Sequence, residues 1–320
     1  MTKYKLHEVN KDEWDILWPK IAFSNMFQSW PYGEAKKYQG WKPYRYSIKD
    51  DHNHDVALVQ VLENRIKYIG KYVGINRGPV YLDDPIKNPL SVEMQKSIWE
   101  AIQFQARLNK WLLIAWSPEL FTSQNIFEIR SIIKPLKMNA WGSHRINLQR
   151  SEEMIFKSLK GKWRNLLRKS INNDSTIVEV NKYLDVKKLI DIYHDFTKLK
   201  GFKGIPPGFL HELYNKYSIS DLIKVYKSVD NNDILLGFVF LVIHGDSATY
   251  LVGWSSQRGR ALLVNYSLLW ECVIYSKNKG IKWFDVGGLN ANTPSGISHF
   301  KSGLNGEKYQ NISTRYKIIL

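Results

Sequence analysis

The most regular pattern of apolar and polar positions lies in residues 248–301. An apolar run at 248–252 predicts a strand. Residues 261–277 are apolar on nearly every side, which predicts a buried helix, and Gly280 is placed to end it. A second apolar run at 281–286 predicts another strand. The order of strand, helix and strand predicts a βαβ-like unit at the centre of the second half of the chain.

Similar patterns predict further elements on both sides of residue 148. We expect a mixed α/β (α+β) chain of two domains, 1–147 and 148–308, with 309–320 as a closing strand that could return to the first domain. Strands are predicted at 4–9, 44–51, 56–63, 79–81, 111–116, 144–148, 176–180, 222–228, 234–244 and 309–319, and helices at 11–19, 31–39, 89–110, 127–134, 152–171, 186–200 and 209–217.

Composition narrows the class of protein. The 320 residues are 44% hydrophobic and 13% aromatic, enough to build a packed core. The single cysteine, Cys272, excludes an intramolecular disulfide and a cysteine-based zinc site, and it suits a reducing cytoplasm. The longest apolar run, 234–243, is too short to span a bilayer, and the first twenty residues lack the apolar core of a signal peptide. We therefore expect a soluble cytoplasmic protein.

The net charge of +16 indicates what kind of partner the protein could bind. It favours a polyanionic partner, which could be RNA, a nucleotide diphosphate or an anionic membrane face, although a generally basic proteome would give the same value. Much of the charge gathers in one predicted helix, which has no acidic residue from 156 to 173. Its basic residues are Lys157, Lys160, Lys162, Arg164, Arg168 and Lys169. Such a run is either a solvated face or a phosphate-binding face.

Familiar catalytic motifs are absent. The sequence has no G-x-S-x-G, H-E-x-x-H or Walker A element, and its eight histidines do not pair at metal-ligand spacing. We therefore predict no metal, and catalysis by positioning and charge stabilisation. Lys301 follows the glycine-rich end of the strand at 281–286, where its amine could stabilise an oxyanion, although a surface lysine would show the same pattern. Residues 255–260 open the buried helix and weakly resemble the coenzyme A pyrophosphate loop of GCN5-related N-acetyltransferases (GNATs).

Six short motifs, in the right order, together resemble the FemAB family of bacterial non-ribosomal peptidyl transferases. They are F-Q-S-x-x-(aromatic)-x-x-x-K at 27–36, R-G-P at 77–79, W-R-x-x-L-R-K at 163–169, Y-x-x-G-x-S at 250–255, D-x-G-G at 285–288 and F-K-x-G-L at 300–304. The resemblance implies two tandem GNAT-like domains, each a mixed sheet flanked by helices.

The resemblance also implies a reaction and its partners. Family members move an amino acid from aminoacyl-tRNA, as co-substrate and without a cofactor, to an amine of a UDP-linked or lipid-linked cell-wall precursor. Peripheral contact with the inner membrane face and no stable protein partner are expected. By resemblance, Lys301 beside Phe300 would stabilise the oxyanion, and the basic helix would contact tRNA. Substrate-binding roles would fall to Lys36, Tyr32, Arg77, Lys203, Tyr250 and Trp254.

The sequence also departs from the family pattern. Classical members insert a coiled-coil arm into the second domain, and the interval from 200 to 222 leaves no room for one, so the chain resembles the short form. An arginine found near Gly201 in some members is represented by Lys203. Two alternatives remain open: an acyl-CoA-dependent N-acyltransferase of surface polysaccharide biosynthesis, and an RNA-binding module that keeps the fold without the reaction.

Overall fold

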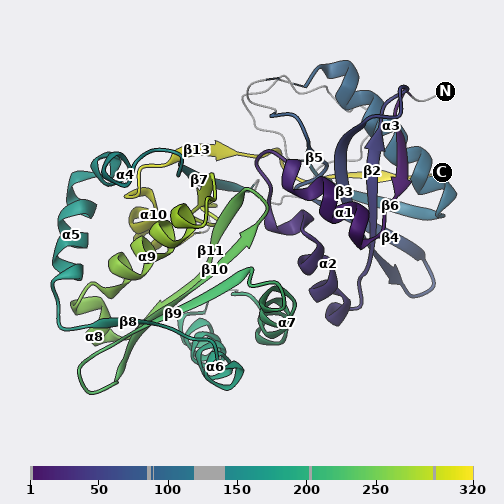
Figure 1. Ribbon diagram of the computed structural model, residues 1–320. Helices are drawn as coiled ribbons and strands as arrows, with labels where there is room; N and C mark the ends of the chain where they lie inside the picture. The colour runs from purple at the N-terminus through teal and green to yellow at the C-terminus, as the bar shows by residue number, and fades with distance from the viewer. Residues whose placement is uncertain are drawn as a thin grey trace. The chain divides into compact units, whose positions relative to one another are not determined.

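The computed structural model describes residues 3–84, 88, 90–118, 141–201, 204–290 and 293–319. The chain divides into two compact units, Met1–Gly142 with Tyr309–Leu320, and Ser143–Lys308. Each unit contains a mixed sheet flanked by helices, which confirms the predicted fold class (Figure 1).

The sheet of the first unit has the strand order β1-β2-β3-β4-β6-β14, and β5 pairs with β3. The neighbours are antiparallel except β4 and β6, which run parallel. The last strand of the chain thus pairs with β6 at one edge. The strands are β1 (Lys5–Glu8), β2 (Lys42–Lys49), β3 (Asp55–Ile66), β4 (Gly70–Asn76), β5 (Val80–Tyr81), β6 (Trp111–Ser117) and β14 (Arg315–Ile318).

The main helix of this unit is α3, which crosses between the parallel strands β4 and β6. It presents Ile98, Ile102 and Ala106 at helical spacing, and these pack with the sheet in one hydrophobic core. Ser91 caps its first turn by accepting a hydrogen bond from the backbone nitrogen of Met94. The helices are α1 (Lys11–Leu17), α2 (Trp30–Lys36) and α3 (Val92–Leu108), with 3₁₀ turns η1 (Trp18–Lys20), η2 (Met26–Gln28) and η3 (Lys37–Gln39).

The second sheet has the strand order β13-β7-β12-β11-β10-β9-β8. Strands β11 and β12 run parallel, as the βαβ-like unit of the sequence predicts. Each sheet therefore contains a parallel pair joined by a helical crossover. The strands are β7 (Gly142–Asn147), β8 (Thr176–Glu179), β9 (Ile223–Val229), β10 (Leu235–His244), β11 (Ser247–Ser255), β12 (Trp283–Asp285) and β13 (Glu307–Gln310).

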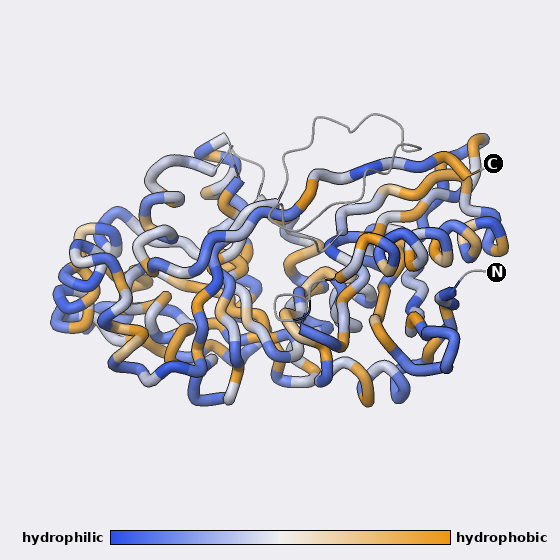
Figure 2. Tube along the Cα trace, turned by 90° about the horizontal axis from the view of Figure 1, so that it is seen from above, coloured by the Kyte–Doolittle hydropathy of each residue, from blue (hydrophilic) through white to orange (hydrophobic). Residues whose placement is uncertain are grey.

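Helices cover both faces of the second sheet, with α6 and α7 on one side and α5, α9 and α10 on the other (Figure 1). Strand β10 is consequently buried along almost its whole length. The helices are α4 (Glu152–Ser158), α5 (Gly161–Ile171), α6 (Tyr183–Lys200), α7 (Pro207–Ser218), α8 (Gln257–Ala261), α9 (Val264–Asn278) and α10 (Ser295–Ser302). Hydrophobic and hydrophilic stretches alternate along the trace (Figure 2).

Several predicted elements are wrong in detail. The helix expected at 261–277 is interrupted at Leu262 and Leu263, where α8 ends and α9 begins. The single helix expected at 152–171 is two helices, because Leu159 and Lys160 have extended backbone angles and Leu159 is buried in the core. The single closing strand expected at 309–319 is two strands, β13 and β14, which belong to different sheets. The helix predicted at 127–134 lies outside the described residues.

Candidate functional site

Helix α10 places the Lys301 side chain against the edge between the parallel strands of the second sheet. Its Nζ donates a hydrogen bond to the backbone oxygen of Gly288, at 3.3 Å. The same atom lies 5.0 Å from the centre of the Tyr250 ring, which comes from β11. Only 8% of Lys301 is exposed, so the sequence alternative of a surface lysine is wrong. The structure brings Lys301, Phe300 and Tyr250 of the predicted site together.

The turn after β12 explains why glycine follows Asp285. Gly287 has a φ of +75°, and a Cβ atom there would lie 2.5 Å from the backbone oxygen of Tyr250 and 3.2 Å from Nζ of Lys301. Asp285 Oδ1 fixes the turn by accepting hydrogen bonds from the Gly287 backbone nitrogen at 2.7 Å and from Ser143 Oγ at 2.5 Å. A side chain at Gly287 would occupy the space that the lysine uses.

Burial changes the acid–base properties of this pair of side chains. It lowers the pKa of Lys301 to about 8, and the negative charge of Asp285 opposes that shift. Burial raises the pKa of Tyr250, so its phenol stays neutral in the physiological range. An ammonium carries three N–H donors, of which Gly288 takes one in the described contacts. A buried cation with further donors can stabilise negative charge that develops on a ligand oxygen.

Phe300 holds α10 in place through aromatic contacts. Its ring lies 5.1 Å from that of Tyr266 on α9, edge to face, and 6.1 Å from that of Trp163 on α5. Trp163 and Tyr266 are 5.1 Å apart, so the three rings form one cluster, the Trp163 cluster. Phe300 therefore acts on Lys301 through the position of the helix, which the sequence alone did not reveal.

Backbone contacts tie α5 to the end of α10 as well. The backbone nitrogen of Lys160 donates to the oxygen of Gly303 at 3.0 Å, and Asn305 Nδ2 donates to the oxygen of Ser158 at 2.9 Å. Two motifs that are far apart in the sequence, at 163–169 and 300–304, thus meet around one helix junction. The basic helix supports the helix that carries Lys301.

The outer face of α5 carries the positive charge. Trp163, Leu167 and Ser170 are buried on the inner face, whereas Lys160, Lys162, Arg168 and Lys169 are exposed. Arg164 is half-buried, and its guanidinium donates to the backbone oxygen of Lys157 at 2.8 Å. The helix is amphipathic, with a packed side and a solvated basic side.

Trp254 has a different environment from Tyr250, although both lie on β11. Its ring stacks on that of Phe238 at 5.5 Å, and none of its described contacts reaches Lys301. Lys203, the remaining predicted site residue of this unit, lies outside the described residues.

In the first unit, Lys36 ends helix α2 beside Tyr32. Its Nζ donates to Gln39 Oε1 at 2.7 Å and lies 5.6 Å from the centre of the Tyr32 ring. Burial lowers the pKa of Lys36. The Tyr32 ring packs edge to face with that of Phe27, at 5.2 Å. The structure thus brings Tyr32 and Lys36 together as a half-buried amine beside an aromatic ring.

Arg77 is enclosed by aromatic side chains. Its guanidinium carbon lies 5.6 to 5.8 Å from the ring centres of Phe27, Trp141 and Tyr309, and its NH2 group donates to the Tyr309 hydroxyl at 3.1 Å. The side chain is 9% exposed. Arg77 therefore packs within the first unit, to which Trp141 and Tyr309 also belong, a role that the motif did not indicate.

The F-Q-S and R-G-P motifs interlock in the same unit. Gln28 donates to the backbone oxygen of Asn76 at 2.7 Å, and a Cβ atom at Gly78 would lie 2.5 Å from the Gln28 side chain. Gln28 also accepts from the backbone nitrogen of Gln60, whose own side chain accepts from Arg45. Buried polar groups need such partners. Gln60 and Arg45 lie in the strands predicted at 56–63 and 44–51, and no sequence pattern indicated their role in this network.

Known proteins share part of this sequence and its fold. Residues 215–314 match the model of the FemAB family. This part of the chain resembles the FemAB family. Its structure is similar to the crystal structure of FemX with a TM-score of 0.82 and 13% identity, over 98% of this chain and 97% of FemX. The comparison with curated proteins finds no match.

Two other solved structures share the fold of this chain. A tandem GNAT protein from the clavulanic acid biosynthesis pathway has a TM-score of 0.53 at 8% identity, over 99% of this chain and 98% of that one. L-PGS from Bacillus licheniformis has a TM-score of 0.53 at 9% identity, over 97% and 93%. The predicted family resemblance and tandem GNAT-like architecture are confirmed.

The loop that weakly resembles a pyrophosphate loop uses two of its backbone amides in hydrogen bonds within the protein. Ser256 caps the short helix α8 by accepting from the backbone nitrogen of Gly259 at 2.9 Å, and its own backbone nitrogen donates to Leu236. A Cβ atom at Gly259 would lie 2.0 Å from the backbone oxygen of Leu236, so α8 packs directly on β10. The glycine therefore serves helix–strand packing, and these two amides are already paired.

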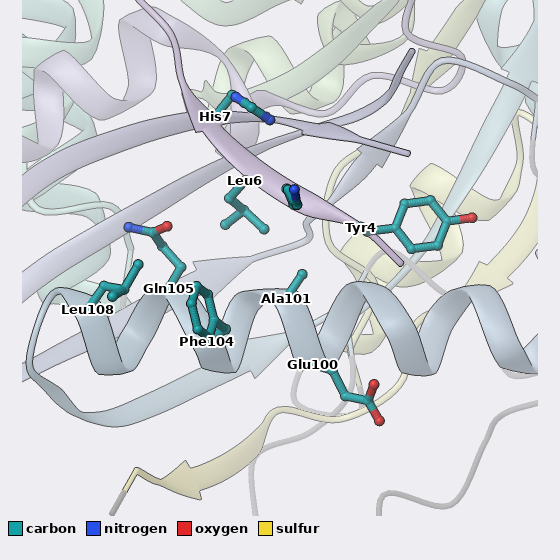
Figure 3. A pocket seen from close by; sticks show the side chains of 9 residues that line it. Tyr4, Leu6, His7, Glu100, Ala101, Phe104, Gln105 and Leu108 are labelled. Carbon is teal, nitrogen blue, oxygen red and sulfur yellow. The ribbon is translucent and has the colours of Figure 1, made fainter. Parts of the chain in front are cut away.

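A groove of about 660 Å³ lies between β1 and α3 in the first unit (Figure 3). Leu6 projects from β1 toward Phe104 and Leu108 of α3, and none of the predicted site residues lines it. Within the described residues, no group of three His, Cys, Asp or Glu side chains is placed to hold a metal ion. The helices of the described ranges are all too short or too polar to cross a membrane.

Proposed function

We propose that this protein transfers an amino acid from aminoacyl-tRNA to an amine of a peptidoglycan or related cell-envelope precursor. The observation that carries the proposal is the buried Lys301 amine, held between Gly288 and Tyr250 at the end of the parallel strand pair. The FemAB match over 215–314 includes these residues, and the likeness to FemX in fold supports the same class of reaction.

The chemistry follows from the position of the amine. The acceptor amine attacks the carbonyl carbon of the aminoacyl ester, and a C–N bond forms while the carbonyl electrons move to oxygen. The Lys301 ammonium stabilises that oxyanion by donating a hydrogen bond. When the intermediate collapses, the ester C–O bond breaks, the ribose hydroxyl leaves with a proton, and the acceptor nitrogen loses one. No metal or covalent enzyme intermediate is needed.

The choice of donor rests on two features of the second unit. The exposed basic face of α5 offers Lys162, Arg168 and Lys169 to a phosphate backbone. The amides of Ser256 and Gly259, which belong to the loop that resembles a coenzyme A site, are paired within the protein. Both features favour aminoacyl-tRNA over acyl-CoA.

In the first unit, Lys36 and Tyr32 are proposed to bind the phosphates of the nucleotide- or lipid-linked acceptor. A half-buried amine beside an aromatic ring suits a diphosphate next to a planar or sugar group. No stable protein partner is required for this reaction, and the cytoplasmic face of the cell envelope is where its substrates would meet.

The test is to incubate the protein with charged tRNAs and UDP-MurNAc-pentapeptide, and to measure the mass of the acceptor. The expected result is a gain of one amino-acid residue, lost in Lys301→Met and kept in Lys282→Met, which changes an exposed lysine near β12. Turnover with acetyl-CoA and none with any charged tRNA would overturn the proposal.

A second candidate, an acyl-CoA-dependent N-acyltransferase, is favoured by the fold shared with the tandem GNAT protein of the clavulanic acid pathway. It predicts coenzyme A binding at micromolar concentration, measurable by calorimetry. An RNA-binding module without catalysis would instead bind tRNA equally well in the wild type and in Lys301→Met, and neither protein would show transfer.

A further inference from the structure

The turn between β3 and β4 exposes an unusual set of apolar side chains. Tyr68 is 93% exposed, Ile69 67% and Ile66 41%. Single exposed apolar residues are ordinary. Three at one turn form an apolar patch, and its exposure to water is energetically unfavourable. We call residues 66–70 the β3–β4 tip.

The β3–β4 tip is an ordered part of the sheet. Arg65 pairs with Lys71 and Ile66 with Gly70 in the antiparallel ladder that leads into it. Gly70 has a φ of +133°, and a Cβ atom there would lie 2.5 Å from Cδ1 of Leu112, at the start of β6. Leu112 is itself 42% exposed. The neighbouring strand therefore extends the apolar surface of the tip.

Positive charge surrounds this apolar surface. Residues 64–72 and 105–112 contain five basic residues and no acidic one. Arg65, Lys67, Arg107 and Lys110 are exposed, and Lys71 forms an ion pair with Glu63 at 3.3 Å. Nζ of Lys67 lies 4.9 Å from the centre of the Tyr68 ring, so charge and apolar surface are in contact.

This combination identifies the kind of partner. Tyrosine partitions into the boundary between lipid head groups and acyl chains, isoleucine favours the apolar side of that boundary, and nearby lysine and arginine attract anionic head groups. RNA would gain nothing from burial of the two isoleucines, because its backbone is recognised by charge. The absence of acid from both segments matches a uniformly anionic surface.

We propose that the β3–β4 tip, with Leu112 beside it, docks onto an anionic lipid bilayer by inserting Tyr68 and Ile69 among the head groups. The inference rests on this surface alone and not on the transfer reaction. It would bring the protein to a membrane that carries a lipid-linked acceptor. Failure of membrane docking would leave transfer to a soluble acceptor unaffected, so the two proposals fail separately.

Sedimentation with vesicles tests the docking. The full chain is mixed with vesicles of phosphatidylglycerol and phosphatidylcholine, or of phosphatidylcholine alone. The wild type is expected to bind the anionic vesicles at least tenfold more tightly, and the double variant Tyr68→Ser, Ile69→Ser to lose at least tenfold of that affinity. The matched control is Leu199→Ser, Ile219→Ser, whose side chains are 83% and 80% exposed elsewhere, and it should bind as the wild type does.

A second measurement reports insertion directly. The only cysteine, Cys272, is buried, so an environment-sensitive fluorophore can be attached selectively to Ile69→Cys or to the control Leu199→Cys. A blue shift with anionic vesicles is expected at position 69 and not at 199. Equal vesicle binding by wild type and tip variant would overturn the proposal. So would a tip variant that loses tRNA binding while it keeps vesicle binding, because the surface would then serve RNA.

Discussion

The indole ring of Trp163 occupies the space that a side chain at Gly303 would need. A Cβ atom on Gly303 would lie 2.2 Å from Cδ1 of Trp163, far inside van der Waals contact. The φ of Gly303 is −70°, so the backbone itself would accept any residue. Position 303 must therefore be glycine because the Trp163 ring leaves no room for a Cβ atom. This contact sets how closely α5 and α10 approach each other.

This contact predicts that Gly303→Ala will push α10 away from α5 and move Lys301. We expect at least a tenfold lower transfer rate and a loss of stability of about 1–3 kcal/mol, which is typical of overpacking. Gly296→Ala is the matched control, because it lies on the same helix with nothing within 4 Å of the added atom. Rate and thermal unfolding measured on both variants check the prediction; equal behaviour of the two would contradict it.

The buried Lys301 predicts an unusual pH dependence of stability. Its pKa is about 8 in the folded chain and near 10.5 when unfolded. Between these values the unfolded state binds the proton and the folded state does not, so the contribution of Lys301 to stability rises with pH. Below pH 8 burying the charge opposes folding. Lys301→Met should therefore stabilise the protein at pH 7 by at most roughly 3 kcal/mol.

Denaturant unfolding at pH 7 and at pH 10.5 measures this effect. The advantage of Lys301→Met over the wild type should shrink as pH rises between those values. Lys282→Met, an exposed lysine, should show no such trend. A constant difference between Lys301→Met and the wild type would count against a depressed pKa.

The negative charge of Asp285 leads to a prediction about the pH dependence of the transfer rate. If the Lys301 ammonium stabilises the oxyanion, transfer should fall as pH rises above about 8. Asp285→Asn keeps an oxygen that can accept from Gly287, and it removes the negative charge that favours the ammonium. The pKa of Lys301 should fall further, so the alkaline limb of the rate profile should shift to lower pH. An unmoved limb in this variant would show that the limb belongs to another group.

Replacing either of two adjacent lysines in the first unit distinguishes substrate binding by a positioned amine from a general effect of positive charge. Lys36 is half-buried beside Tyr32, whereas Lys37 is exposed and forms an ion pair with Glu34. Lys36→Met should raise the KM for a diphosphate-linked acceptor at least tenfold, because a positioned cation is removed. Lys37→Met should change it less than twofold, since a surface ion pair contributes little. Steady-state kinetics with varied acceptor distinguishes them.

The basic face of α5 predicts a salt-dependent interaction with RNA. Replacing Lys162 and Lys169 by glutamine should lower the slope of log affinity against log salt by about 0.7–0.9 for each phosphate that the variant no longer neutralises. The control replaces Lys187 and Lys188 on α6, which are equally exposed in the same unit. Filter binding of tRNA between low and moderate salt measures the slope. If both pairs reduce it equally, the interaction is diffuse and not specific to α5.

The elements with strong periodicity could be predicted from the sequence. The strand–helix–strand unit at 248–286 appears as β11, α8, α9 and β12, because its apolar runs are long and glycines bound them. The position of Lys301 after a glycine-rich turn also made it a candidate site residue. What the pattern could not supply was its burial, which depends on the fold of Gly287 against Tyr250.

Other parts of the site depend on contacts between distant residues. The break at Leu159 and Lys160 follows from the burial of Leu159 and the bond from Lys160 to Gly303, neither of which leaves a local signal. Likewise, the sequence identified Gln28 only as part of the F-Q-S motif. Its partner Gln60 lies 32 residues away, and the bond between them gives the motif its structural meaning.

The pairing of β14 with β6 has a consequence for synthesis of the chain. Strand β6 pairs on one edge with β4, which precedes it in the chain. Its other edge pairs with residues 315–318 of β14, which are made much later. On the ribosome, the second unit can emerge in full while the first still presents an open strand edge, a site where unpaired backbone groups recruit foreign strands. The unit whose synthesis begins first is thus completed only after residues 315–318 have been made, and until then its open strand edge needs protection.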